Sequence, residues 1–153
     1  MVNSPLLDSS ATLRLLEVFL CAEVSAVADH LSAIDTLHAA PLARVLRHNL
    51  CSHEDRVRLL TKEILRLGGI PSAGNDVTPS PAPAMRATAF DIETAVALLE
   101  AGETRGRDAY LRELETVDPK EQPFVRWLLS EQRDSRALVL DLKAMMAVIR
   151  RHD

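Results

Sequence analysis

Four ionisable side chains occupy positions where a core-facing helix normally carries apolar residues. Four stretches of the chain have apolar residues at alternating three- and four-residue steps, a spacing typical of the buried face of a helix. Each of these stripes is interrupted near its middle by one ionisable residue: Glu23, His53, Glu103 and Glu131. Charges at core positions are normally paired or bound to a cation, because an isolated buried charge is costly. The four residues are therefore candidate ligands of one divalent metal ion, with His53 as the nitrogen ligand and Asp134 assisting.

The spacing of these residues along the chain predicts that they meet. Measured from the centre of its predicted hairpin turn, Glu23 lies roughly 17 residues away and His53 roughly 13. The corresponding separations for Glu103 and Glu131 are roughly 16 and 12 residues. At a rise of about 1.5 Å per residue, the side chains of each pair lie within roughly 6 Å along the helix axis. The two predicted hairpins thus carry their polar residues at matching heights.

Helices predicted over residues 11–38, 41–68, 88–117 and 121–151 must position these side chains. Proline is suited to the first helical turn, as at residue 41, and the Gly-Gly-Ile-Pro stretch that begins at residue 68 is typical of a helix end. The crossover at residues 70–87 contains four prolines, and when extended it could span about 55 Å, enough to cross the bundle. The sequence predicts an all-α protein, a single domain over residues 1–153 folded as an antiparallel four-helix bundle. The alternative is a flexible linker between two helical hairpins.

Composition excludes several classes of function. The 22 acidic and 18 basic residues give a net charge of −4, and neither half of the chain has the basic excess that nucleic-acid binding requires. No apolar stretch approaches the length of a membrane span, and the N-terminus does not resemble a signal peptide. Cys21 and Cys51 lack metal-binding spacing, which favours a cytoplasmic protein with both thiols reduced and buried as small hydrophobes. The chain has no phosphate loop, nucleophile elbow or zinc motif, so ordinary enzyme classes have no support.

Three segments resemble the ligand-bearing helices of the ferritin-like four-helix-bundle superfamily. They are residues 21–30 (CAEVSAVADH), residues 63–71 (EILRLGGIP) and residues 98–106 (LLEAGETRG). The layout is similar, more narrowly, to a family of small uncharacterised bacterial ferritin-like proteins, a domain of unknown function. The resemblance covers roughly residues 11–149. It implies a ferritin-like topology with one long crossover between the second and third helices.

The resemblance also implies a set of metal-site positions. Such bundles bind two iron or manganese ions through one Glu from each of two helices and a Glu-x-x-His pair from each of the others. Glu23 and Glu103 match the two single-Glu positions, and Glu131 matches the Glu of the fourth helix. Asp134, or Ser135, falls where that helix should supply His.

The second helix departs from this pattern. His53 falls where the family supplies Glu, and Arg56 falls where it supplies His. A permanently charged Arg56 cannot bind a metal and would repel one. It could instead neutralise Glu23 and Glu103 as a core counter-ion, which satisfies the buried carboxylates without a metal.

Two hypotheses for function follow. The first is a ferritin-like bundle with a degenerate metal centre and no cofactor, acting as a non-catalytic structural or interaction module; a role in stress response is implied by the resemblance alone. The alternative is an iron- or manganese-dependent oxidase or iron-handling protein that uses the core carboxylates and His53. His30 is interpreted as a packing residue rather than a ligand.

A homodimer is predicted from apolar residues that lie off the main stripe of the fourth helix, namely Trp127, Leu129, Val139 and Met146. Any other protein partner is unknown.

Overall fold

The computed structural model describes residues 9–37, 40–72 and 92–152. It contains four helices: α1 (Ser9–Thr36), α2 (Ala40–Arg66), α4 (Ile92–Glu113) and α5 (Gln122–Arg150). None of the residues in these three ranges belongs to a strand, which confirms the all-α prediction. Most of the predicted crossover, residues 73–87, and the predicted start of the third helix at residues 88–91 lie outside the described residues.

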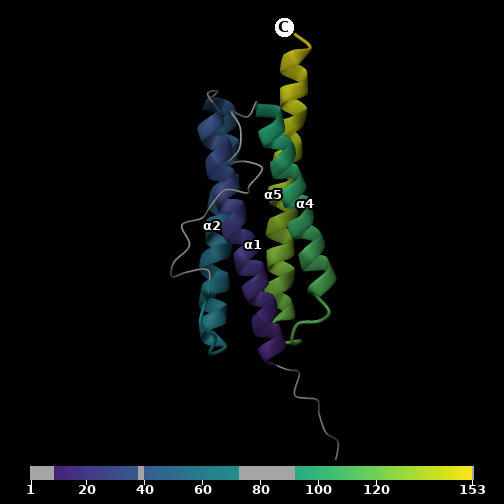
Figure 1. Cartoon of the computed structure of the whole chain (residues 1–153). Coiled ribbons are helices and arrows are strands. Elements are labelled where there is room, and N and C mark those ends of the chain that lie inside the picture. Colours follow the sequence, from purple (N-terminus) through teal and green to yellow (C-terminus); the bar gives the residue numbers. More distant parts are fainter. Residues whose placement is uncertain (1–8, 38–39, 73–91, 153) are drawn as a thin grey trace, which may run out of the picture.

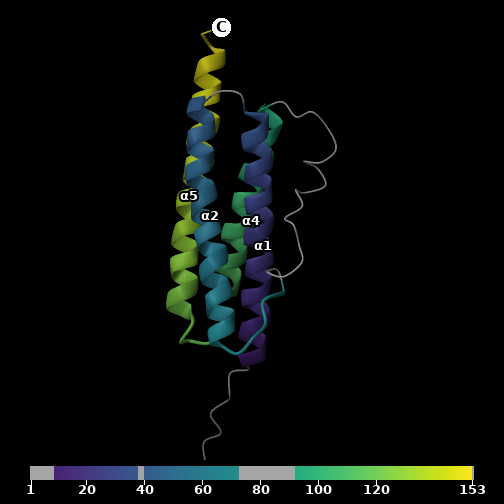
Figure 2. The ribbon, with the colours of Figure 1, turned by 90° about the vertical axis from the view of Figure 1, so that its left-hand side faces the viewer.

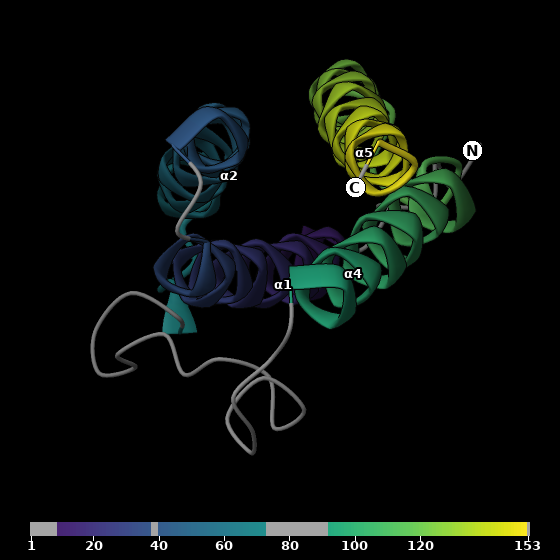
Figure 3. The ribbon, with the colours of Figure 1, turned by 90° about the horizontal axis from the view of Figure 1, so that it is seen from above.

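The four helices lie side by side with their long axes roughly aligned (Figure 1, Figure 2). Helix α1 packs against α2 and α4, and α5 packs against the same two helices. Seen from above, α1 lies between α2 and α4, and α5 lies beside α4 (Figure 3). In Figure 1 the chain runs upward in α1 and α5 and downward in α2 and α4. Each described helix therefore contributes one face to a shared interior.

The ends of the helices follow local sequence signals. Helix α2 ends at Arg66, and two residues later Gly68 has a φ of 81°, in the left-handed region that favours glycine. The N–H of Gly69 then donates to the carbonyl oxygen of Ile64 at 2.9 Å. Helix α4 ends at Glu113, four residues before the predicted boundary at residue 117. The chain turns early there because Val117 is buried in the core, with 1% of its surface exposed.

The core consists of two apolar clusters separated by a polar layer. One cluster is built around Leu46, Leu99 and Leu142, and the other around Leu16, Leu60 and Leu128. The layer between them contains buried polar residues from all four helices: Glu23, His30, Asn49, His53, Arg56, Glu103, Gln132 and Ser135. Because apolar side chains cover it above and below, this layer lies in a region of low dielectric where charges interact strongly.

Helix α5 is rotated by about one residue from the predicted register. Its buried residues are Val125, Leu128, Leu129, Gln132, Ser135, Val139, Leu142 and Met146. The prediction that Leu129, Val139 and Met146 lie off the core face was wrong, since all three pack inside this bundle. Of the four residues from which a homodimer was predicted, only Trp127 is exposed.

Two further expectations concern the exposure of the cysteines and the apolar length of the helices. Cys21 and Cys51 are free and exposed, so the prediction that they are buried hydrophobes was wrong. Cys21 follows the buried Leu20 by one residue, a rotation of about 100° around α1 that carries it off the core face. No helix among the described residues is both long enough and apolar enough to cross a membrane.

Candidate functional site

His53 bridges two carboxylates at the centre of the bundle. Its Nδ1 lies 2.6 Å from Oε2 of Glu23 on α1, and its Nε2 lies 2.8 Å from Oε1 of Glu103 on α4. Burial alone would lower the pKa of His53, but its hydrogen bonds to Glu103 and Glu23 outweigh that effect and raise the pKa above its ordinary value. Both ring nitrogens face carboxylate oxygens, which only accept hydrogen bonds. His53 is therefore an imidazolium that donates to both carboxylates.

Arg56, one turn along α2, is the second cation of the cluster. Its side chain is fully buried, with 0% of its surface exposed. Nη1 donates to Oε1 of Glu23 at 3.1 Å and to Oε1 of Gln132, and Nη2 donates to Oγ of Ser135 at 2.8 Å. Nε donates to the carbonyl oxygen of Ser52 at 3.3 Å. The guanidinium thus lies in the core and links α2 to both α1 and α5.

One contact in this network sets two donors against each other. Nη2 of Arg56 lies 2.9 Å from Nδ1 of His53, which is also the nitrogen beside Glu23. Nδ1 cannot donate to Glu23 and accept from Arg56 at the same time. We assign the proton to Nδ1, because the carboxylate is nearer and opposite in charge. The positive charge of Arg56 partly opposes the raised pKa of His53.

Tyr110 completes the surroundings of Glu23. Its hydroxyl donates to Oε1 of Glu23 at 2.5 Å, and its ring packs against Phe19 with centroids 4.7 Å apart. Burial would raise the pKa of Glu23, but the hydrogen bond and charge of His53, together with Arg56 and Tyr110, lower it. Burial and the neighbouring carboxylate raise the pKa of Tyr110 well above its ordinary value. Glu23 is therefore held as an anion and Tyr110 as a neutral donor.

The charges of the cluster sum to zero without a metal ion. Glu103 accepts from His53, from Nδ2 of Asn49 at 3.3 Å and from Nε2 of Gln132, which also donates to the Glu103 carbonyl oxygen. The two carboxylates contribute −2, and the His53 imidazolium and the Arg56 guanidinium contribute +2. A buried group of charges is tolerated when it is paired and hydrogen-bonded in this way.

His30 belongs to the cluster as a neutral ring, not merely as the packing residue expected from the sequence. Its Nδ1 lies 2.8 Å from the carbonyl oxygen of Ala26 and so carries the proton. Its Nε2 then accepts from Nδ2 of Asn49 at 3.0 Å and lies 3.5 Å from Oε1 of Glu103. Burial first, and then the positive charge of His53, lower the pKa of His30 to about 4.

Three of these residues have the spacing to hold one metal ion. One ligand atom from each of His30, His53 and Glu103 lies within 4.8 Å of the others. The Nδ1 atoms of the two histidines contact the Ala26 carbonyl oxygen and Glu23, the kind of outer partner that metal-binding histidines use. A divalent ion would add +2 and require His53 to give up its Nε2 proton, leaving the cluster at +1. Binding would therefore need an accompanying anion.

The structure does not assemble the full set of predicted ligands. It brings Glu23, His53, Glu103 and Arg56 together, but Asp134 is exposed on the outside of α5. Glu131 is only half-buried, and it accepts from Oγ of Ser52 at 3.3 Å instead of facing the cluster. The physical reason is the rotation of α5, which turns Gln132 inward in place of Glu131.

Sequence reasoning missed the amide side chains of the cluster. The sequence does not single out Asn49 and Gln132, because an uncharged polar residue in an apolar stripe is less conspicuous than a charged one. A seven-residue repeat of Val125, Gln132, Val139 and Met146 is the signal that could have placed Gln132 in the core. Asn49 sits three residues after Leu46 and four before His53, which is also a core-facing step.

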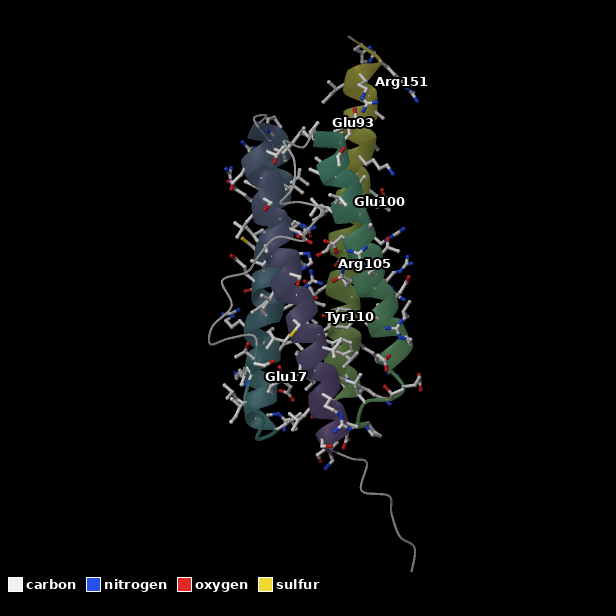
Figure 4. All side chains as sticks on the ribbon, in the orientation of Figure 1. Glu17, Glu93, Glu100, Arg105, Tyr110 and Arg151 are labelled. Carbon is white, nitrogen blue, oxygen red and sulfur yellow. The ribbon has the colours of Figure 1, made fainter. Side chains whose placement is uncertain are left out.

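A pocket of about 520 Å³ between α1 and α4 opens onto the cluster. Its lining includes small residues on both helices, namely Ala22, Ala26, Gly102 and Gly106, and it reaches Glu103. Arg105 and Tyr110 also line it, and Figure 4 shows both of them on α4, close to α1. The cluster is thus buried yet adjacent to a space that a small molecule could enter.

Replacing Gly106 by alanine is expected to destabilise the protein by about 1–3 kcal/mol, because overpacking carries a cost of this size. The new Cβ would lie 2.9 Å from Nε2 of Gln132, which would have to give up its bonds to Glu103. Gly102 is the matched control, since a Cβ there meets only Nη2 of Arg105 at 3.9 Å. Gly102→Ala should be neutral or stabilising by up to about 1 kcal/mol through helix propensity. Equal effects in urea unfolding of the two variants would contradict this packing.

Stability is expected to fall by about 2 kcal/mol between pH 7 and pH 5 through His30. Its pKa is lowered to about 4, so the unfolded chain takes up this proton below about pH 6.5 while the folded protein does not. The contribution is complete above pH 6.5 and is lost as the pH falls toward 4. Glu121 and His53, whose pKa values are raised, act in the opposite sense, but both residues are present in the two proteins compared. Urea unfolding of the native protein and of His30→Gln should show the steeper acid loss only in the native protein; parallel pH profiles would refute it.

No family model, no curated protein and no solved structure matches this chain. The cluster and the pocket must therefore be interpreted from their own geometry and charges.

Proposed function

We propose that this chain is a non-catalytic interaction module, a ferritin-like bundle in which a charge-neutral polar cluster has replaced the metal centre. The observation that carries the proposal is the guanidinium of Arg56, fully buried and donating to Glu23, Gln132 and Ser135. It stands at the position where the ferritin-like resemblance expects a metal-binding His. A guanidinium there supplies positive charge to the carboxylates in place of a metal.

The proposed antiparallel, ferritin-like topology is supported by the directions of the helices. In Figure 1, α2 and α4 both run downward, so the end of α2 and the start of α4 lie at opposite ends of the bundle. Two hairpins joined in this way need one long connection, as in ferritin-like folds. The resemblance extends the proposal to a bacterial, cytoplasmic protein with a role in stress response.

The second candidate function is a metal-binding protein, an oxidase or an iron-handling protein. It is favoured by one specific observation, the convergence of ligand atoms from His30, His53 and Glu103 within 4.8 Å. Iron or manganese would suit such a site of two imidazoles and one carboxylate. This candidate requires His53 to be neutral, whereas the proposed interaction module requires it to be charged.

Metal content and metal-dependent melting separate the two candidates. We expect protein purified without chelator to contain no stoichiometric iron, manganese or zinc, and its melting temperature to be unchanged by Fe²⁺, Mn²⁺ or Zn²⁺. A ligand at 100 times its Kd would stabilise the fold by about 2.7 kcal/mol, which a melting curve detects readily. One ion per chain that is lost in Glu103→Gln but retained in Glu100→Gln would overturn the proposal. Glu100 is the control because it pairs with Lys143 at the surface.

A further inference from the structure

The pocket between α1 and α4 has the size of a small-molecule site. Its volume of about 520 Å³ lies within the roughly 300–1,000 Å³ typical of ligand pockets. It is lined by α1 from Phe19 to His30 and by α4 from Leu99 to Arg112, with Gln132 of α5 and His53 of α2 at its inner end. Its depth, walls and mouth differ in chemistry, and these differences restrict what it can hold.

The inner end of the pocket is unsuited to a charged group. Glu23, Glu103 and Gln132 are already engaged in the cluster, and their charges and donors are matched. A further anion there would face two buried carboxylates, and a further cation would leave the cluster with excess positive charge. The part of a ligand that reaches this depth must therefore be uncharged.

The walls of the pocket favour an apolar ligand body. Phe19 and Leu99 supply large apolar surfaces, and the remaining wall is made by small side chains such as Ala22, Ala26 and Ala109. Small residues leave the space open, and a ligand that fills it removes apolar surface from water, worth about 25 cal/mol per Å². A flat or narrow hydrocarbon group fits these walls.

The mouth of the pocket offers one unpaired charge. Asp108 pairs with Arg107 at 2.8 Å, Arg112 pairs with Glu113 at 2.9 Å, and Asp29 also has a partner. Arg105 is exposed, and within the described ranges no ion pair or hydrogen bond engages it. Its Nη2 lies 3.9 Å from the position that a Cβ on Gly102 would take, and Gly102 lines the same pocket.

We propose that this pocket binds a small organic acid, with the carboxylate on Arg105 at the mouth and the apolar body between α1 and α4. Arginine matches a carboxylate with two parallel N–H donors. The inference rests on the proposed interaction module and names the ligand class it takes. It does not require metal in the cluster.

The test is an NMR titration of the ¹⁵N-labelled protein with three matched probes: 3-phenylpropionate, its neutral amide and the corresponding amine. We expect the amide signals of Ala26, Gly102 and Gly106 to move with the acid at lower concentrations than with the other two probes. Because an exposed ion pair is worth about 0.2–1 kcal/mol, the preference for the acid should be roughly 1.4- to fivefold. Arg105→Gln should abolish the preference. Arg126→Gln, a change at an exposed arginine on α5, should leave it intact.

Three results would overturn the proposal: no shifts at pocket residues with any probe, equal affinity for acid and amide, or a preference that survives Arg105→Gln. Gly102→Leu provides an independent check, because a Cβ there meets only Nη2 of Arg105 and the larger side chain should weaken the binding of all three probes by occupying the opening. The measurement is separate from metal content. A metal-free protein that binds no acid refutes this inference alone, and a stoichiometric metal ion refutes the proposed function.

Discussion

Replacing Arg56 by alanine is expected to lower the free energy of unfolding by about 3–5 kcal/mol, the usual cost of removing one partner of a buried ion pair. The change leaves Glu23 with one cation fewer, and it leaves the acceptors on Gln132 and Ser135 without their donor. Urea denaturation followed by circular dichroism measures the loss. Arg126→Ala, at an exposed position on α5, should stay within about 0.5 kcal/mol of the native protein.

Two further variants test whether the loss comes from charge or from volume. Arg56→Lys keeps the charge but cannot reach several acceptors with a planar fork, so it should lose less than Arg56→Ala. In the double variant with Arg56→Met and Glu23→Gln, the unpaired charge is absent, so its loss should be smaller than the sum of the single losses. A loss below about 1 kcal/mol for Arg56→Ala would show that the guanidinium does not stabilise the core.

Replacing His53 by glutamine should cost about 3 kcal/mol at pH 7, because one buried carboxylate loses its cation. Glutamine is close to histidine in volume and its amide can still donate hydrogen bonds, so the variant mainly removes the charge. His48→Gln is the control on the same helix, where the side chain is exposed. Unfolding by urea at pH 7 gives both values.

The charge balance makes a sharper prediction for a second change at Glu103. Adding Glu103→Gln to His53→Gln restores neutrality, since one carboxylate then faces one guanidinium. The double variant should therefore be more stable than His53→Gln alone, although it has lost another native residue. A double variant that is less stable than the single one would mean that hydrogen-bond geometry, not charge, determines the stability of the cluster.

Much of the fold could be predicted from the sequence because its signals are local. The Gly-Gly-Ile-Pro stretch ends α2 through a left-handed Gly68, and proline and apolar periodicity place the other helices within a few residues. The sequence predicts the end of α4 four residues too late, because Val117 fits the apolar pattern of a longer helix. Val117 is buried because the chain turns there and packs it against the other helices. The apolar pattern of a single helix does not predict such a turn.

The site was predictable only in part, for a geometric reason. Glu23, His53 and Glu103 stand out because charges in apolar stripes are rare, and the structure places them in contact. Glu131 and Gln132 are adjacent on α5, and a rotation of about 100° decides which one faces inward. His30 carries its proton on Nδ1 because this nitrogen contacts the Ala26 carbonyl oxygen. Its pKa is low because the ring is buried and lies near the positive charge of His53. These surroundings exist only in the assembled bundle, so the sequence does not reveal them.

The protonation state of His53 tests the metal-free cluster most directly. Because its pKa is raised, its contribution to stability is complete below about pH 6.5 and is lost only as the pH rises through the folded-state pKa. The ¹⁵N chemical shifts of the imidazole nitrogens report whether each nitrogen carries a proton, and they are measured at about pH 6, below the raised pKa of His53 and above the pKa of about 4 of His30. The account predicts protons on both nitrogens of His53 and on Nδ1 alone of His30. A neutral His53 with an unprotonated Nε2 would contradict it and favour the metal-binding candidate.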